Sequence, residues 1–144
     1  MKEIKFQALI IGVSPRQYLE SVDVFRDKWI LYTQDENDPN VYWEEPVGLS
    51  EFADLNDLVF RMYTGRKDKN GRRIYEGDIL KVQGYGDNYV VIQWSEQTAS
   101  FMAYSPTLKG YNLLNEIDEI GEIIGNIYEN PELLSEYRRE SNER

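Results

Sequence analysis

Residues 58–82 read LVFRMYTGRKDKNGRRIYEGDILKV, and this stretch decides the fold class. The apolar and aromatic run Leu58–Tyr63 predicts a β-strand, and Ile79–Val82 predicts another. The polar loop 64–73 between them carries Asn70-Gly71, a pair that suits the positive φ angles of a type I′ hairpin turn. We therefore expect antiparallel β structure here rather than a helix.

Further strand candidates follow toward the C-terminus, at Tyr89–Trp94, Ser100–Tyr104 and Glu122–Tyr128. Several short strands with turn-rich links between them are typical of a small antiparallel barrel or sandwich, and they argue against a parallel sheet. Asn130 is a favourable helix N-cap, and Pro131 suits the first helical position. We therefore expect a short helix after the last strand.

The pattern divides the chain into two modules, and the fold class that we predict is mainly β. Residues 58–144 form a small antiparallel β-barrel or sandwich-like module with a short C-terminal helix. Residues 1–57 form a smaller module that contains a β-hairpin, because Val22–Phe25 and Trp29–Thr33 are β-prone runs separated by three polar residues. The alternation of polar and apolar residues over Lys2–Leu9 predicts a half-buried strand before this hairpin.

The rest of the first module carries weaker signals. Ser14-Pro15 has the residues of a helix start, although at most one helical turn could follow. Residues 34–48 are rich in Asp, Glu, Asn and Pro, which predicts a long loop interrupted at 41–43. Ser50 could cap a short helix over Glu51–Leu55.

Two long blocks of the chain, 62–82 and 124–134, match one known family in order and spacing. The first contains Tyr75-Glu76-Gly77-Asp78, and the second begins with Ile124-Gly125-Asn126. They resemble the YopX family of bacteriophage and prophage proteins. The opening Lys5-Phe6-Gln7-Ala8 is similar to the family's start, but it lacks the usual basic residue and tryptophan around the alanine.

The resemblance implies a largely β fold and an accessory role in a phage or prophage. It also implies self-association, as is thought to occur in some members. It brings no catalytic residues, because no activity is established for the family.

Two missing residue types restrict the chemistry. The chain has no histidine and no cysteine, which excludes zinc sites, disulfides and Ser-His-Asp or Cys-His nucleophile systems. We therefore expect no enzyme and no cofactor. A carboxylate-dependent enzyme is the weakest of three functional alternatives.

Charge and hydropathy indicate the compartment and the partners. No apolar run approaches the length of a membrane helix, and no signal-peptide core follows Met1, so we expect a protein of the bacterial host cytoplasm with no membrane contact. The net charge is −10, and residues 1–60 carry 5 basic and 12 acidic groups. Such a chain repels nucleic acid. Residues 61–94 are the exception, because they carry 7 basic and 4 acidic groups.

The loop 64–73 is the one candidate for contact with nucleic acid. Its basic side chains could bind phosphates, with Tyr63 and Tyr75 beside them for stacking. The competing interpretation is a solvated hairpin whose charges keep a strand edge soluble. The basic side chains of the loop are Arg66, Lys67, Lys69, Arg72 and Arg73.

Other motifs have structural explanations. The loop segment 68–71 lacks the ligand spacing of a calcium loop, and neighbouring arginines would repel a cation, so no metal site is expected. Glu76-Gly77-Asp78 is interpreted as a turn that leads into a strand, and Gly125 and Asn126 as a bulge or tight packing.

Aromatic residues of the first half support our leading hypothesis. A short hairpin cannot easily bury them alone, so they either pack in a core or form a subunit contact. We expect a non-enzymatic phage accessory protein that binds another protein or assembles with itself. The interface residues that we predict are Trp29, Tyr42 and Trp43.

Acidic residues cluster in three places, 35–38, 44–45 and 116–119. They could imitate the phosphates of a nucleic acid and engage a host protein that binds one. The alternative is that they serve solubility, as acidic surfaces commonly do.

Overall fold

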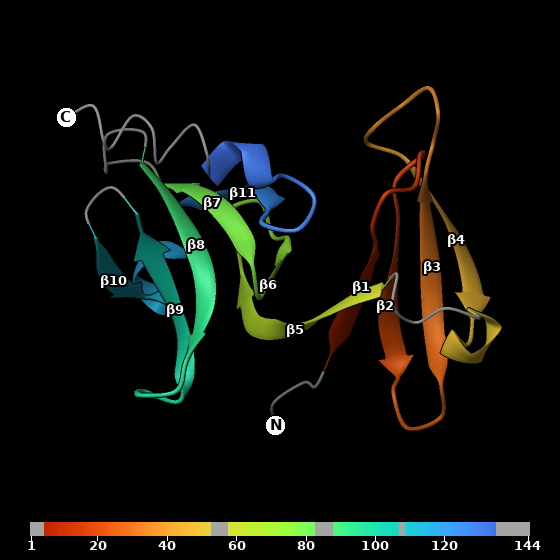
Figure 1. Cartoon of the computed structure of the whole chain (residues 1–144), viewed down its shortest axis with the longest axis horizontal. Helices are drawn as coiled ribbons and strands as arrows, with labels where there is room; N and C mark the ends of the chain where they lie inside the picture. Colours follow the sequence, from red (N-terminus) through yellow and green to blue (C-terminus); the bar gives the residue numbers. More distant parts are fainter. Residues whose placement is uncertain (1–4, 53–57, 83–87, 107–108, 135–144) are drawn as a thin grey trace. The chain divides into compact units, whose positions relative to one another are not determined.

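The computed structural model describes residues 5–52, 58–82, 88–106 and 109–134, and it divides into two compact units (Figure 1). The units are Met1–Met62 and Tyr63–Arg144. Their regular structure is mostly β, which confirms the predicted fold class. The division falls inside one long strand, β5 (Leu58–Lys67). The predicted domain division after residue 57 stays a prediction, because compactness alone does not show that a unit folds independently.

The first unit is built around one antiparallel sheet, with the strand order β4-β3-β2-β1-β5. Each strand of this order pairs antiparallel with its neighbours, so the chain runs back and forth across the sheet before β5 joins at β1. The strands that precede β5 are β1 (Phe6–Ile10), β2 (Gln17–Asp23), β3 (Lys28–Gln34) and β4 (Tyr42–Val47).

One face of this sheet carries the core of the first unit. Ala8 lies opposite Leu19 on the neighbouring strand, and both are buried with Trp29. Leu49 of the 3-10 turn η1 (Leu49–Glu51) packs against this cluster. Asp27 holds the turn in place, since its carboxylate accepts hydrogen bonds from the backbone amides of Leu49 at 2.8 Å and Ser50 at 3.3 Å.

The predicted first strand is present, and so is the hairpin, although its first strand is β2 and the predicted residues Val24 and Phe25 lie in the turn. No helical turn follows Ser14-Pro15, which agrees with the expectation of one turn at most, and β2 begins at Gln17. Two other predictions for this unit are corrected. Residues 42–47 form the strand β4 rather than a loop, because an edge strand tolerates the charges and the proline that suggested a loop. Ser50 lies within η1 and Gly48 takes the N-cap position. The predicted helix beyond residue 52 lies outside the described residues.

The second unit combines a hairpin with an open antiparallel sheet. The hairpin joins the second half of β5 to β6 (Arg73–Tyr75), and the sheet has the strand order β10-β9-β8-β7-β11. A single helical turn, α1 (Leu114–Ile117), lies between the last two strands of the sequence. The strands of the sheet are β7 (Asp78–Val82), β8 (Asn88–Ser95), β9 (Ser100–Ser105), β10 (Gly110–Leu113) and β11 (Gly121–Asn126).

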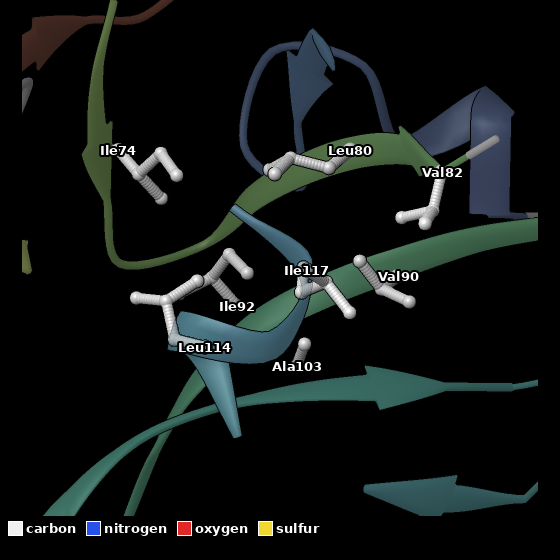
Figure 2. Packing of buried hydrophobic residues seen from close by; sticks show 8 residues of the cluster. All are labelled: Ile74, Leu80, Val82, Val90, Ile92, Ala103, Leu114 and Ile117. Atoms are coloured by element: carbon white, nitrogen blue, oxygen red, sulfur yellow. The ribbon is translucent and has the colours of Figure 1, made fainter. Parts of the chain in front are cut away.

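A buried apolar cluster joins the hairpin, the sheet and α1. Figure 2 shows Leu114 and Ile117 of α1 lying over Ala103 and Ile92 of the sheet. Ile74 of β6 belongs to the same cluster, so the hairpin and the sheet pack face to face in a sandwich-like arrangement. The remaining members are Leu80, Val82 and Val90.

The strands predicted at 79–82, 89–94, 100–104 and 122–128 correspond to β7, β8, β9 and β11. The sequence did not predict β6, β10 or α1, and β5 continues to Lys67, into the predicted loop 64–73. The turn at residues 70–71 is not type I′, because that turn needs two positive φ angles and only Gly71, at +80°, has one.

The predicted C-terminal helix begins as expected, with residues 131–134 helical, and its continuation lies outside the described residues. None of the described helical segments is long and apolar enough to cross a membrane.

Candidate functional site

The basic loop between β5 and β6 is held against β11. The buried carboxylate of Asp68 accepts hydrogen bonds from the loop amides of Asn70 and Arg72, both at 2.9 Å. Its second oxygen accepts one from the amide of Ile123 at 3.0 Å, and the amide of Lys69 donates to the carbonyl of Gly121. The loop is therefore a fixed part of the second unit and does not project freely into solvent.

Three of the five basic side chains predicted for nucleic acid already have partners. Arg66 pairs with Asp118, and the Nζ atom of Lys69 lies 3.9 Å from Glu122. The guanidinium of Arg73 lies over the ring of Tyr63, 5.7 Å from its centre. Of the predicted five, Lys67 and Arg72 are exposed and have no side-chain partner among the described residues. Three of the five predicted basic side chains are therefore engaged in contacts within the second unit.

The pair Arg66–Asp118 fastens β5 to the segment after α1. The Asp118 side chain is only 3% exposed, whereas Arg66 is 46% exposed. The hydrogen bond to Asp118, and then its negative charge, raise the pKa of Arg66. The Oδ1 atom of Asp118 is buried and has no hydrogen-bond partner within the described part of the chain. This carboxylate therefore depends on Arg66.

The glycine turns have the structural roles that were predicted for them. Gly77 has a φ of +85°, and a Cβ atom there would lie 2.7 Å from the ring of Tyr128. The carboxylate of Asp78 accepts the amide of Tyr75 at 2.8 Å. Gly125 follows a bulge in β11, and a Cβ atom there would lie 2.5 Å from the Oδ1 atom of Asn130.

The first unit presents a cluster that we call the tyrosine surface, made of Arg16, Tyr18, Tyr32 and Tyr42. Tyr18 and Tyr32 are directly opposite in register and stack with ring centres 5.0 Å apart. Tyr42 meets Tyr18 edge-on at 5.4 Å. The guanidinium of Arg16 lies 4.6 Å from the centre of the Tyr18 ring and donates a 2.9 Å hydrogen bond to the hydroxyl of Tyr42.

This surface lies on the sheet face opposite the core. Successive side chains of a strand point to opposite faces, and Leu19 and Leu31 belong to the core cluster, so their neighbours Tyr18 and Tyr32 point away from it. All four residues are partly exposed. Burial of the Tyr18 ring, followed by the nearby Glu20 carboxylate, raises the pKa of the Tyr18 hydroxyl.

The three predicted interface residues lie in different surroundings. Trp29 is 3% exposed and lies in the core of the first unit. For this residue, core packing is therefore the correct one of the two alternatives, and subunit contact is not. Tyr42 belongs to the tyrosine surface. Trp43 is 64% exposed, and its indole donates a 3.2 Å hydrogen bond to Asp35. Only Tyr42 and Trp43 are therefore accessible to a partner.

Two members of the tyrosine surface, Arg16 and Tyr18, were missed by sequence reasoning. Their signal was the alternation of Arg16, Tyr18 and Glu20 on one side of a strand, but the helix start at Ser14-Pro15 obscured it.

The acidic clusters are partly used for local structure. Asp35 accepts the amides of Asn37 and Asp38, and the first of these bonds does most to lower the pKa of Asp35. Asp118 is buried against Arg66, whereas Glu44 and Glu45 are exposed on β4. Within the described ranges, no group of three or more Asp and Glu side chains is arranged to hold a metal ion.

The comparisons with known proteins agree with this architecture. The family model described as "YopX protein" matches residues 17–135. The crystal structure of protein EF1440 from Enterococcus faecalis is similar, with a TM-score of 0.52 and 23% sequence identity over 93% of this chain and 99% of that chain. At this identity, the likeness shows a shared fold. No curated protein matches the chain.

Proposed function

The chain belongs to the YopX family, and we propose that it is a non-enzymatic accessory protein of a phage or prophage that acts by binding another protein. The observation that carries this proposal is the tyrosine surface. Tyrosine and arginine are enriched among the residues that contribute most to protein–protein affinity. Here three tyrosines and one arginine lie together on an outward sheet face.

The tyrosine surface is ordered before any partner arrives. Tyr18 stacks on Tyr32, and Arg16 is held both by the Tyr18 ring and by the Tyr42 hydroxyl. Fixing long side chains in an interface costs conformational entropy, and a preformed cluster avoids much of that cost. The geometry therefore supports binding with little rearrangement.

The neighbouring strand edge favours contact with the face of the sheet. β4 is the outer strand, and Glu44, Glu45 and Pro46 occupy its middle. Charges and proline discourage a foreign strand from pairing with an edge. A partner therefore docks on the tyrosine surface, with Trp43 on the opposite face of β4 available to a partner that wraps around this edge.

The two alternatives have less support. Nucleic-acid contact through the loop 64–73 would rely on Lys67 and Arg72, because the other three basic side chains have partners. A carboxylate-dependent enzyme would need available acids, but the buried Asp68 and Asp78 already accept hydrogen bonds from backbone amides.

An affinity experiment with matched variants tests the proposal. Tagged wild-type protein, the variant R16A/Y32A and the control variant Phe25→Ala would each be used as bait in extracts of lysogenic host cells. Phe25 is 95% exposed in the turn before β3, so its truncation should leave the fold and the tyrosine surface unchanged.

We expect a protein that wild type and F25A retain and that R16A/Y32A loses by at least about tenfold, which corresponds to about 1.4 kcal/mol of binding free energy. Circular dichroism would confirm that all three baits are folded. Equal retention by R16A/Y32A, or no specific protein on the wild-type bait, would overturn the proposal.

A further inference from the structure

We propose that the free edge of β10 pairs antiparallel with β10 of a second copy, which produces a symmetric dimer with one continuous ten-stranded sheet. This surface belongs to the second unit and is separate from the tyrosine surface. The proposal therefore goes beyond the function proposed above and can fail independently of it.

The other edge of the same sheet is covered by the chain itself. β11 ends the strand order opposite to β10, and the loop between β5 and β6 lies along it. The amide of Ile123 donates to Asp68, and the carbonyl of Gly121 accepts the amide of Lys69. Backbone groups that would attract a foreign strand are therefore already paired at this edge.

The outer strand of the first unit is protected in another way. β4 carries Glu44, Glu45 and Pro46 in the middle of its six residues. Proline lacks the amide that a new strand would need, and the charges disfavour a dry contact.

β10 shows none of these protections. It is the last strand of its sheet, and within the described residues no element pairs with it on the side away from β9. Its sequence, Gly110-Tyr111-Asn112-Leu113, contains no charge and no proline. Tyr111 is 58% exposed and Leu113 is 46% exposed. An uncharged edge with exposed apolar side chains is the kind that pairs with another strand.

The apolar surface continues onto the neighbouring strand. Tyr111 lies opposite Tyr104 on β9, with ring centres 4.9 Å apart, and Leu113 lies opposite Met102. α1 does not cover this side, because Leu114 and Ile117 point into the core on the other face of the sheet (Figure 2). The exposed side chains of β10 are therefore continuous with the half-buried Tyr104 and Met102 on β9.

The strand is complementary to itself. A two-fold axis at Asn112 places Tyr111 opposite Leu113 of the second copy, and the same contact is repeated on the other side of the axis. Aromatic and aliphatic side chains directly opposite each other stabilise an antiparallel pair. No charged side chain enters the seam, which matters because each chain has a net charge of −10.

Size and charge determine how such a dimer behaves. A four-residue edge buries much less than the roughly 1,600 Å² of a standard interface, so the dimer should dissociate on dilution. The two acidic chains repel each other at long range, and salt screens this repulsion. Dimerisation should therefore increase with both protein concentration and salt.

Analytical ultracentrifugation tests this directly on the full chain. Wild type should shift from monomer toward dimer as its concentration rises, and more so at high salt. The variant Y111K/L113K should remain monomeric. The control V24K/F25K makes the same change of charge at two exposed positions in the turn between β2 and β3 and should dimerise like wild type.

A cross-linking experiment covers the case in which Y111K/L113K fails to fold. The chain has no cysteine, so Asn112→Cys introduces a single thiol on the proposed two-fold axis. Directly opposite residues in an antiparallel pair have Cα atoms about 4.5–5.5 Å apart, which a disulfide can span. N112C should form covalent dimers under mild oxidation at least tenfold faster than the control Phe25→Cys.

Wild type that stays monomeric at every concentration and salt would overturn the dimer. Equal dimerisation of a folded Y111K/L113K, or equal cross-linking of N112C and F25C, would also overturn it. The two proposals separate cleanly, because R16A/Y32A should still dimerise and Y111K/L113K should still retain the protein partner.

Discussion

The carboxylate of Asp68, at the tip of the β5–β6 hairpin, accepts a 3.0 Å hydrogen bond from the backbone amide of Ile123, 55 residues further along the chain. The same side chain also accepts the amides of Asn70 and Arg72. One buried carboxylate therefore shapes the hairpin loop and joins it to β11. The most basic loop of the sequence therefore covers the β11 edge of the five-stranded sheet.

Replacement of Asp68 by Ala should be among the most destabilising changes in the second unit. Three backbone amides lose their acceptor, and leaving a buried polar group unpaired costs about 1–3 kcal/mol. Because solvent can reach part of the loop, we expect a total loss of about 3 kcal/mol in the free energy of unfolding. Urea denaturation measures it. The neighbouring Lys67→Ala should change this free energy by less than about 0.5 kcal/mol, and equal effects would contradict the assigned role.

Replacement of Arg66 by Ala should expose the dependence of Asp118 on the one partner that it has among the described residues. The variant leaves the buried Asp118 carboxylate without its counter-charge, so we expect a clear loss in the free energy of unfolding. Adding Asp118→Asn removes the unpaired charge and should recover part of this loss. A double-mutant cycle by urea denaturation would contradict the prediction if the two losses simply added.

Strands could be predicted from the sequence where a β-prone apolar pattern is flanked by turn residues. Elements that form because of tertiary contacts could not be predicted. β7, β8 and β9 have apolar patterns of their own, whereas β4 contains Glu44, Glu45 and Pro46, which are equally common in loops. α1 is a single turn that exists because Leu114 and Ile117 fill a core gap. Such a short helix has almost no local stability.

The candidate sites show the same limit. Composition identified five basic side chains in one loop. The partners of Arg66 and Lys69, which are Asp118 and Glu122, lie far away in sequence, and no local pattern indicates them. Tyr42 was predicted at an interface, but Tyr18 beside it was not. The position of Tyr18 in this cluster depends on the register between β2 and β3. The pairing register is set by which face of the sheet is buried, and that face is defined only when all the strands are assembled.

Two glycines with nearly the same backbone angle should respond differently to alanine. Gly77 and Gly71 have φ angles of +85° and +80°, but a Cβ atom meets the Tyr128 ring at 2.7 Å only at Gly77 and meets nothing within 4 Å at Gly71. Gly71→Ala should cost about 1 kcal/mol from the backbone angle alone. Gly77→Ala should cost at least about 2 kcal/mol more because the Tyr128 ring must also move. Thermal unfolding would contradict this if the two variants melted together.

Nucleic-acid binding should be absent or should depend on two side chains. If the protein binds single- or double-stranded DNA at low salt, Lys67 and Arg72 supply the contacts, and the log–log salt slope should have a magnitude of about 2 or less. Lys67→Ala together with Arg72→Ala should then abolish it, while Lys28→Ala serves as an exposed control. Fluorescence anisotropy measures both. A slope near 5 would contradict the pairing of Arg66, Lys69 and Arg73 within the fold.

The loss of folding stability at acidic pH should depend in part on Asp27. Hydrogen bonds from the amides of Leu49 and Ser50 lower the pKa of Asp27 below its usual value of 3.8, the Leu49 bond contributing most. A group whose pKa is lower in the folded state contributes stability above its unfolded pKa and loses it as the pH falls through the folded value. Wild type should therefore be more stable than Asp27→Asn at neutral pH, and this advantage should shrink below pH 3.8.

Asparagine is the right replacement because residue 27 has a positive φ of 53°, which Asn tolerates, so the backbone is preserved and only the charge changes. Asp35→Asn offers a matched comparison, since backbone amides lower the pKa of Asp35 in the same way. Asp35 orders an exposed loop and accepts a hydrogen bond from the exposed Trp43 indole, whereas Asp27 holds η1, whose Leu49 packs against the core of the first unit. The neutral-pH loss should therefore be larger for D27N. Urea denaturation at several pH values measures the difference in free energy of unfolding between wild type and D27N. A difference that stays constant from neutral to acidic pH would show that the carboxylate charge does not hold this turn.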